Sequence, residues 1–212
     1  LSTYFGQSFV VENRSGADSL IASELVARAE PDGHVIYVIS TAHTVNQTLY
    51  KNVTFDAHKD FSGISLVGDV PNLVIVHPSL PAKNLREFVA LAKRKKGELS
   101  FASSASITHL ATEMLNKATG IETLRLAYKG AGPAIIGLVS GEAHFMVTGI
   151  GPVLPHVRAG KLRALAVTAM KRSSHAPEVP TADESGVPGF VTGVWYAVLA
   201  PARTPRPVID RD

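Results

Sequence analysis

The sequence predicts an α/β fold. Stretches with helical periodicity alternate with short β-branched runs along all 212 residues, which is typical of a mostly parallel sheet flanked by helices. Turn residues separate these runs, as at Pro31-Asp32-Gly33. Hydrophobic residues make up 45% of the chain and charged residues 18%, which excludes disordered, collagen-like and coiled-coil proteins. A chain of this length can form one large domain or two modest ones, each with its own core.

The first half of the chain combines β-branched runs with two amphipathic stretches. The turn at residues 31–33 ends the first of these helices, because proline cannot continue a helix and glycine permits the reversal. The predicted elements are, in order, a strand at 9–12, a helix at 20–29, a buried strand at 35–40, a loop, a meander around 64–67 and 73–77, and a helix at about 82–96.

The second half repeats the rhythm and predicts a complete α/β lobe. Its elements are a strand at 99–102, a helix at 108–118, a strand at 122–127, a helix at 134–140, a strand at 143–147, a helix at 152–159 and a strand at 164–168. Residues 170–189 are rich in proline, serine and glycine and predict a long ordered loop that crosses back towards the first lobe. A strand at 194–199 follows.

Composition also limits the kinds of function. The longest apolar runs, at 73–76 and 162–167, fall far short of the roughly 20 residues that span a bilayer. The chain has no cysteine, which excludes disulfides and thiolate metal sites. The net charge of +3 owes much to the basic run at 93–96, which is interpreted as the solvated end of a helix. No aromatic platform accompanies this run, so nucleic acid is not an expected partner.

Polar or glycine-rich loops follow four of the predicted strands. Ligands of open α/β sheets bind beyond the carboxyl ends of strands, so these loops are the candidate ligand-binding positions. The candidate residues are Thr41, His43 and Asn46, then Ser103, Ser104, Ser106 and His109, then Tyr128, Gly130 and Gly132, and finally Thr148 and Gly149.

The serine-rich loop has two interpretations. A helix N-terminus presents unpaired N–H groups and partial positive charge, so three serines within four positions favour an anion site. Serine is also a preferred helix cap, which is the structural alternative. The other candidate residues also have a structural alternative to ligand binding. Gly130 and Gly132 could form only a tight turn, Tyr128 could be buried for packing, and His109 could pair with a neighbouring side chain.

Catalytic signatures are absent from the sequence. It contains no G-x-S-x-G elbow, no H-E-x-x-H and no G-x-x-x-x-G-K-[ST] motif, and it has no cysteine nucleophile. Glu142 and His144 would share a strand face, but two ligands make a weak metal site. The sequence therefore predicts a binding protein with no catalytic residues, no metal and no cofactor.

Several motifs, read with these loops in one register from Leu1 to about Val208, resemble one family. They are Val11-Glu12-Asn13-Arg14-Ser15-Gly16-Ala17, Ala29-Glu30-Pro31-Asp32-Gly33, Leu49-Tyr50-Lys51, Pro71-Asn72, Tyr128-Lys129-Gly130, residues 160–168, Val179-Pro180-Thr181 and Ala200-Pro201-Ala202. The chain resembles the Bug family, the extracytoplasmic solute-binding proteins of tripartite tricarboxylate transporters.

The resemblance implies a two-lobed type II periplasmic binding fold with central mixed, mostly parallel sheets and an incomplete first lobe. It implies a first lobe at 1–99, a second at 100–194 and a return into the first at 195–212. It further implies a periplasmic location, no catalysis, and a small carboxylate (a dicarboxylate, an aromatic carboxylate or an acidic amino acid) held between the lobes for delivery to membrane permease subunits. The family's ligand loops correspond to the four loops named above.

The sequence departs from the family pattern in two ways. The stretch Ser103-Ser104-Ala105-Ser106 replaces a glycine-containing family loop and is about two residues shorter. Leu1 aligns inside the family's first helix, and the family continues beyond the position of Asp212. The first lobe is therefore expected to lack a strand and helices, to expose apolar surface there and to favour pairing with a second copy.

Two other functional classes are compatible with this architecture. The effector-binding domain of a transcriptional regulator shares it, but would follow a DNA-binding helix-turn-helix that the sequence does not show. An α/β hydrolase or transferase would need a nucleophile with a base in reach.

Overall fold

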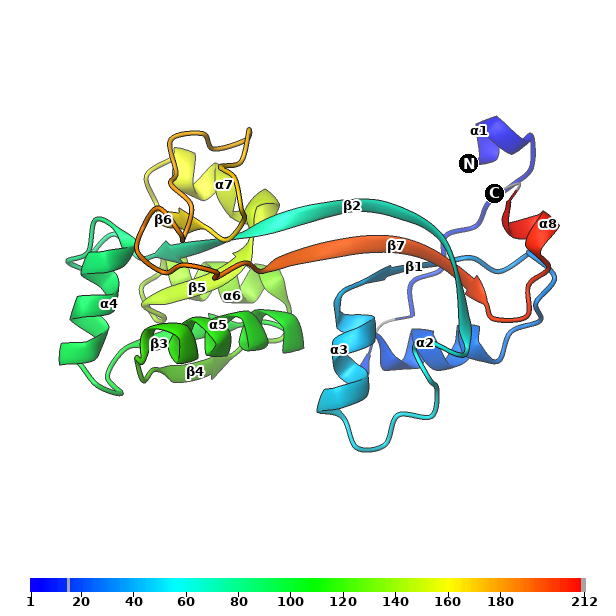
Figure 1. Cartoon of the computed structure of the whole chain (residues 1–212), viewed down its shortest axis with the longest axis horizontal. Coiled ribbons are helices and arrows are strands. Elements are labelled where there is room, and N and C mark those ends of the chain that lie inside the picture. Colours follow the sequence, from blue (N-terminus) through cyan, green and yellow to red (C-terminus); the bar gives the residue numbers. More distant parts are fainter. Residues whose placement is uncertain (15, 211–212) are drawn as a thin grey trace.

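Two groups of elements, here called the first and second lobes, are joined by two long strands (Figure 1). The computed structural model describes residues 1–14 and 16–210. Ser15 of the family motif and positions 211–212 of the predicted final segment therefore lie outside the described residues. The connecting strands are β2 (Phe61–Val76) and β7 (Gly193–Pro201), which pair with each other from Phe61↔Pro201 to Pro71↔Gly193.

The first lobe contains the remaining N-terminal elements and the last helix. They are α1 (Ser2–Phe5), the 3₁₀ helix η1 (Ala17–Ser19), α2 (Leu20–Ala27), β1 (Tyr37–Ser40), α3 (Ala42–Leu49) and α8 (Arg206–Ile209). Strand β1 pairs with β7 in antiparallel register, from Tyr37↔Leu199 to Ser40↔Tyr196. The small core of this lobe gathers Val26, Phe55 and Phe61.

The second lobe alternates helices and strands as the sequence predicts. Its elements are α4 (Leu85–Arg94), β3 (Ser100–Ser103), α5 (Ser106–Thr119), β4 (Leu124–Ala127), α6 (Ala131–Val139), β5 (Phe145–Gly149), α7 (Ile150–Arg158) and β6 (Arg163–Val167). Each predicted helix and strand from 82 to 168 is present, with bounds that differ by a few residues. Gly120 ends α5 with φ of 66°, a conformation that glycine adopts without a steric penalty.

The sheet is mixed, as the resemblance implies, but most of its strand pairings are antiparallel, so the expectation of a mostly parallel sheet is wrong. The strand order is β1-β7-β2-β5-β3-β4, with β6 also paired to β2. Among the described strands, β3 pairs in parallel with β4 and with β5, whereas the other four strand pairings are antiparallel. The physical reason is that the chain leaves the first lobe along β2 and returns along β7, so these strands run in opposite directions.

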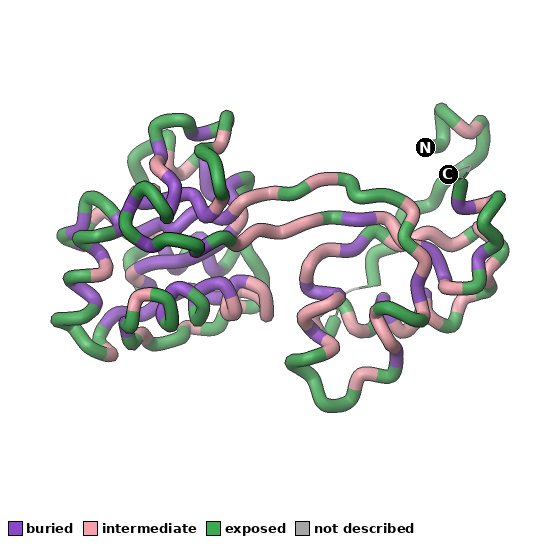
Figure 2. The backbone as a smooth tube through the Cα atoms, in the orientation of Figure 1, coloured by how far each residue is buried: buried purple, intermediate pink, exposed green. Residues whose placement is uncertain are grey.

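The second half of β2 separates two cores. Successive side chains of a strand point to opposite faces. Val74 and Val76 therefore enter a core with Phe88, Phe101 and Phe145, while Leu73 and Ile75 enter another with Leu138, Met146 and Val153. All four strand residues are fully buried, because helices cover both faces of the sheet here (Figure 2).

Four predictions for the first half are wrong. Residues 9–12 form no strand, because no described strand lies beside them to pair with, and Val10 and Val11 are exposed. The predicted loop after residue 40 is helix α3. The two strands of the predicted meander are one strand, β2, which absorbs its irregularities as register shifts after Gly63 and after Leu66. The strand predicted as buried at 35–40 buries only Ile39 within β1.

Residues 170–189 form a loop, as predicted, but that loop stays on the second lobe. Ala176 and Val179 enter one core of that lobe, and Ala182 and Val187 enter the other. The return to the first lobe is made instead by β7 (Figure 1). In the described ranges, no helix combines the length and the apolar character needed to cross a membrane.

Candidate functional site

A cavity of about 430 Å³ lies where the two lobes meet, and both lobes contribute to it. From the first lobe come η1 and the end of α3, and from the second lobe come the start of α5 and one residue of β4. The lining residues are Asp18, Leu49, Tyr50, Ser104, Ala105, Ser106, His109 and Arg125.

The start of α5 is shaped by Thr108. The Thr108 hydroxyl accepts hydrogen bonds from the N–H groups of Ser104 and Ala105, at 3.0 and 3.1 Å. These bonds fold the loop after β3 back over the first turn of the helix. The serines are therefore not the cap of α5, and the hydroxyls of Ser104 and Ser106 are left for other contacts.

Two hydrogen bonds join the lobes beside this cavity, and a third links their first-lobe partners; the three together are here called the interlobe contact. The N–H of Ser106 donates to Asp18 Oδ2 at 3.0 Å, and the Ser106 hydroxyl donates to Asn46 Oδ1 at 2.9 Å. Asn46 in turn donates through Nδ2 to the backbone carbonyl of Asp18. The carboxylate of a first-lobe residue thus lies on the positive end of a second-lobe helix.

Arg125 and His109 supply the basic groups of the cavity. Arg125 Nε donates to the Ser103 hydroxyl at 3.3 Å, which fixes the guanidinium beside the loop. The His109 ring stacks on Phe101, and His109 Nε2 lies 3.6 Å from Glu113 Oε1. Burial, and secondarily the charge of Arg125, lowers the pKa of His109. His109 is therefore mostly neutral at neutral pH, and Arg125 is the permanent cation.

Of the three predicted residues from the α3 region, Asn46 takes part in this contact. His43 is buried in the first lobe, where its ring stacks on Phe55 and Nδ1 bonds the Ser23 hydroxyl at 3.0 Å. The Thr41 hydroxyl accepts from the N–H of Trp195 at 3.0 Å and so ties α3 to β7. These contacts hold the first lobe together, and a ligand role for Thr41 and His43 stays a prediction.

The other predicted loops do not line the cavity. The Tyr128 ring packs against Gly137, and burial raises the pKa of its hydroxyl. Gly130, with φ of 106°, is the N-cap residue that precedes α6, and Gly132 lies in the first turn of the helix. Thr148 and Gly149 end β5 and pair with β2. Because β3, β4 and β5 run parallel, these loops and the start of α5 lie at the same edge of the sheet.

The structure adds lining residues that the sequence argument missed. Arg125 lies within β4, so a search confined to the loops after strands could not select it. Asp18 lies in η1, outside any strand-end loop. Tyr50 belongs to the family motif Leu49-Tyr50-Lys51, and this membership could have identified it as a candidate site residue.

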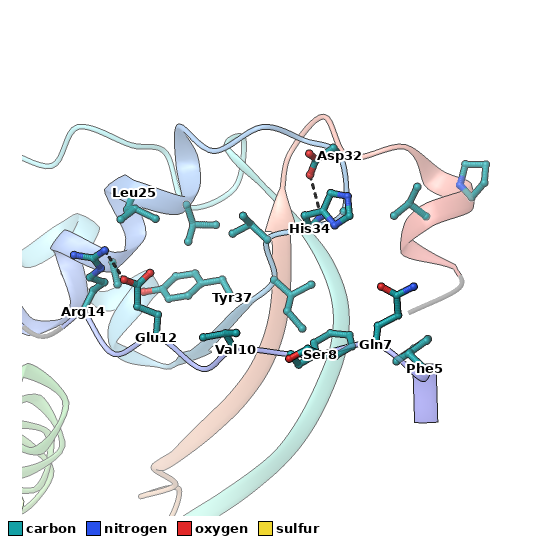
Figure 3. A pocket seen from close by; sticks show the side chains of 18 residues that line it. Phe5, Gln7, Ser8, Val10, Glu12, Arg14, Leu25, Asp32, His34 and Tyr37 are labelled. Atoms are coloured by element: carbon teal, nitrogen blue, oxygen red, sulfur yellow. Dashed lines mark hydrogen bonds and ion pairs between the residues drawn. The ribbon is translucent and has the colours of Figure 1, made fainter. Parts of the chain in front are cut away.

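A larger cavity of about 920 Å³ lies within the first lobe (Figure 3). The extended segment at 7–14, α2, residues 32–37 and α8 surround it. Three of its charged side chains have partners within the lining: Arg14 pairs with Glu12, and Asp32 accepts the N–H of His34 at 2.9 Å. We therefore take the interlobe cavity, with its convergent charged groups, as the candidate site. Within the described part of the chain, no cluster of three or more histidine, aspartate and glutamate side chains could hold a metal.

Comparison with known protein families and sequences gives a consistent result. The family model described as "TctC: Tripartite tricarboxylate transporter family receptor" matches residues 1–211. Protein BugT of Bordetella pertussis is 36% identical over 213 residues, which cover 99% of this chain and 65% of BugT. A protein encoded in the tcbD-tcbE intergenic region of Pseudomonas sp. is 36% identical over 214 residues, or 64% of its length. The chain thus spans less than two thirds of the length of these relatives.

Solved structures agree in fold. A protein of R. palustris solved with adipate superposes with a TM-score of 0.92 at 35% identity, covering 99% of this chain and 71% of that one. The periplasmic binding protein BugD superposes with a TM-score of 0.88 at 35% identity, with the same coverage. MatC from Rhodopseudomonas palustris, solved with bound malate, superposes with a TM-score of 0.88 at 31% identity and 72% coverage of MatC.

Proposed function

Because the chain belongs to the tripartite tricarboxylate transporter receptor family, whose members are binding proteins and not enzymes, we propose that it captures a small carboxylate between its lobes. The observation that carries this proposal is the interlobe cavity with Arg125 beside the start of α5. Relatives that were solved with adipate and with malate support a carboxylate ligand.

Arg125 is the primary anchor for the carboxylate in this proposal. Its Nε is engaged by Ser103, and the remaining guanidinium N–H groups can donate to two carboxylate oxygens. The Ser104 hydroxyl and neutral His109 add hydrogen-bond donors at the same wall of the cavity. Gly130, Gly132, Thr148 and Gly149 are retained as candidate contacts, because their loops open at the same sheet edge.

The two lobes are proposed to divide within the connecting strands. Val74 and Phe88 already belong to a core of the second lobe, which supports a first crossing within β2 near Pro71 and not after residue 99. The return crossing is proposed at the start of β7, near the predicted position 194/195. Ligand release would then require the β2–β7 ribbon to bend and the interlobe contact to open.

Location and partners follow from the family and are part of the proposal. A periplasmic location and delivery of the carboxylate to membrane permease subunits fit a transporter receptor. The family match over residues 1–211 leaves no observation in favour of the effector domain of a transcriptional regulator. Pairing with a second copy through the first lobe stays a prediction.

Isothermal titration calorimetry with malate, succinate and adipate tests the proposal. Arg125→Gln should weaken binding of the ligand that the parent prefers by at least about tenfold, because a charge-assisted bidentate pair is lost. The double variant Ser104→Ala/Ser106→Ala should likewise lose about tenfold or more, because it removes the Ser104 donor and the Ser106 hydroxyl that bonds Asn46 across the lobes. Arg158→Gln is the matched control, since Arg158 is exposed, lies outside the cavity lining and donates to the carbonyl of His175. Equal affinity of parent and Arg125→Gln would reject this site.

A further inference from the structure

We propose that Asp18 makes the interlobe site selective for zwitterionic ligands, in which one carboxylate is combined with a protonated amino group, over dicarboxylates. The proposal rests on the proposed function, because it takes the interlobe cavity to be the carboxylate site. It assigns the ammonium group to Asp18 and the carboxylate to Arg125.

Asp18 is held at the cavity by an unusual stretch of backbone. Ala17, Asp18 and Ser19 have φ values of 45°, 53° and 76°, a region that side-chain-bearing residues rarely adopt. The carbonyl groups of this stretch are tied down: Asn46 donates to that of Asp18, and the Tyr37 hydroxyl donates to that of Ser19 at 3.4 Å. Surrounding contacts therefore enforce the conformation that aims Asp18 at the second lobe.

The two oxygens of the Asp18 carboxylate differ in their contacts. Oδ2 accepts the N–H of Ser106 and so takes a donor at the start of α5 that an incoming anion would otherwise use. Oδ1 accepts no hydrogen bond from any residue in the described ranges. This second oxygen offers a negatively charged acceptor to a group on the ligand, and an ammonium group satisfies it best.

The charges of the cavity lining nearly cancel. Arg125 contributes one positive charge and Asp18 one negative charge, while His109 is mostly neutral because its pKa is lowered. No ion pair between Asp18 and Arg125 occurs among the described residues, so each can serve a ligand group of opposite sign. A dicarboxylate would bring two negative charges to one cation and one anion, whereas a zwitterion matches both.

The test compares three ligands with the same four-carbon skeleton: 2-aminobutyrate, succinate and butyrate. Calorimetry on the parent chain should show 2-aminobutyrate binding at least tenfold more tightly than either of the others. Asp18→Asn should remove most of this preference, since it deletes the charge alone. Asparagine keeps the size of the side chain and an acceptor for the N–H of Ser106, and it tolerates positive φ, so the interlobe contact and the fold should persist.

Asp32→Asn is the matched control, since Asp32 is an exposed first-lobe carboxylate far from the lining of the site. It should leave the order of the three ligands unchanged. Tighter binding of succinate than of 2-aminobutyrate by the parent would overturn the proposal, as would an unchanged preference in Asp18→Asn. If carboxylate binding still depends on Arg125 in either case, the proposed carboxylate site is retained and only the role of Asp18 is rejected. Carboxylate binding that is indifferent to Arg125→Gln would instead reject the site.

Discussion

In the second lobe, the strand segment 73–76 lies fully buried between two cores, whereas strand β1 of the first lobe buries one residue of four. In the described part of the first lobe, the core cluster gathers the buried side chains of Val26, Phe55 and Phe61, while Val10, Val11 and Val38 are exposed. The two lobes also play different parts at the site. The second lobe presents Arg125 and the start of α5 from a densely packed scaffold, while the first lobe contributes Asp18 through a constrained loop. Burial thus separates the lobe that presents Arg125 from the lobe that contributes Asp18.

Truncating a phenylalanine in each lobe is the strongest test of this difference. Phe88→Ala should lower the free energy of unfolding by about 3 to 5 kcal/mol, because Phe88 is fully buried and leaves a cavity. Phe9→Ala should cost less than about 1 kcal/mol, because Phe9 is 38% exposed on an extended segment. Urea denaturation followed by circular dichroism measures both. Similar losses in the two variants would contradict the difference in packing.

Adding a methyl group tests how tightly the second lobe is filled. A Cβ on Gly137 would lie 2.6 Å from Tyr128 Cζ and overlap its hydroxyl. Gly137→Ala should therefore destabilise the chain, at the upper end of about 1 to 3 kcal/mol. Gly132→Ala, in the same helix, is the control: its Cβ would have no neighbour within 4 Å, so stability should hold or rise slightly. Thermal denaturation distinguishes the two.

Protonation of His43 should weaken the first lobe. Burial, with a smaller contribution from His58, lowers the pKa of His43 from 6.5 to about 4. Between these values the unfolded chain binds a proton that the folded chain does not, so stability is present above pH 6.5 and is lost as the pH falls. The loss attributable to His43 should be about 2 kcal/mol on going from pH 7.5 to pH 5.

Unfolding curves at these two pH values check the His43 prediction. His43→Gln should show a smaller drop in stability than the parent, because glutamine does not titrate. His34→Gln, which changes an exposed histidine of the same lobe, should drop as the parent does. A drop that is the same in His43→Gln and the parent would show that His43 is not the titrating group.

Helix capping provides the smallest expected effect. Asn84 caps α4 by accepting the N–H of Glu87 at 2.9 Å, whereas Ser19, at the start of α2, makes no capping bond. Asn84→Ala should cost about 1 kcal/mol and Ser19→Ala only a few tenths. Denaturant midpoints of the two variants measure this. If Ser19→Ala destabilises the chain as much as Asn84→Ala, then α2 and α4 do not differ in N-terminal capping as we infer.

The sequence predicted the second lobe far better than the first. Elements such as α4 carry their own signals, here an asparagine cap, apolar periodicity and basic residues in the last turn. The first half contains segments whose structure depends on distant partners. Residues 9–11 are apolar and include two β-branched valines, yet residues 9–12 form no strand because no described strand pairs with them.

The site was predictable only in part. Ser104, Ser106 and His109 line the cavity as candidates selected from strand-end loops, and Asn46 joins the interlobe contact. Arg125 was not predicted as a site residue. From the sequence alone, a charged residue in a short strand that lines a cavity looks the same as a charged residue that faces solvent. Asp18 was not predicted either, because no neighbouring residue in the sequence indicates which group its carboxylate will contact.

By itself, the sequence determined the α/β class, the order of elements from 82 to 168 and, through its motifs, the family to which the chain belongs. These features follow from local periodicity, caps and turn residues, which act within a few positions of one another. Only the tertiary structure decided that β2 is one strand shared by both lobes and that Asp18 and Arg125 line one cavity. The reason is physical: Asp18 meets the N–H of Ser106 across 88 positions of the chain, and that meeting exists only once two separate cores have formed.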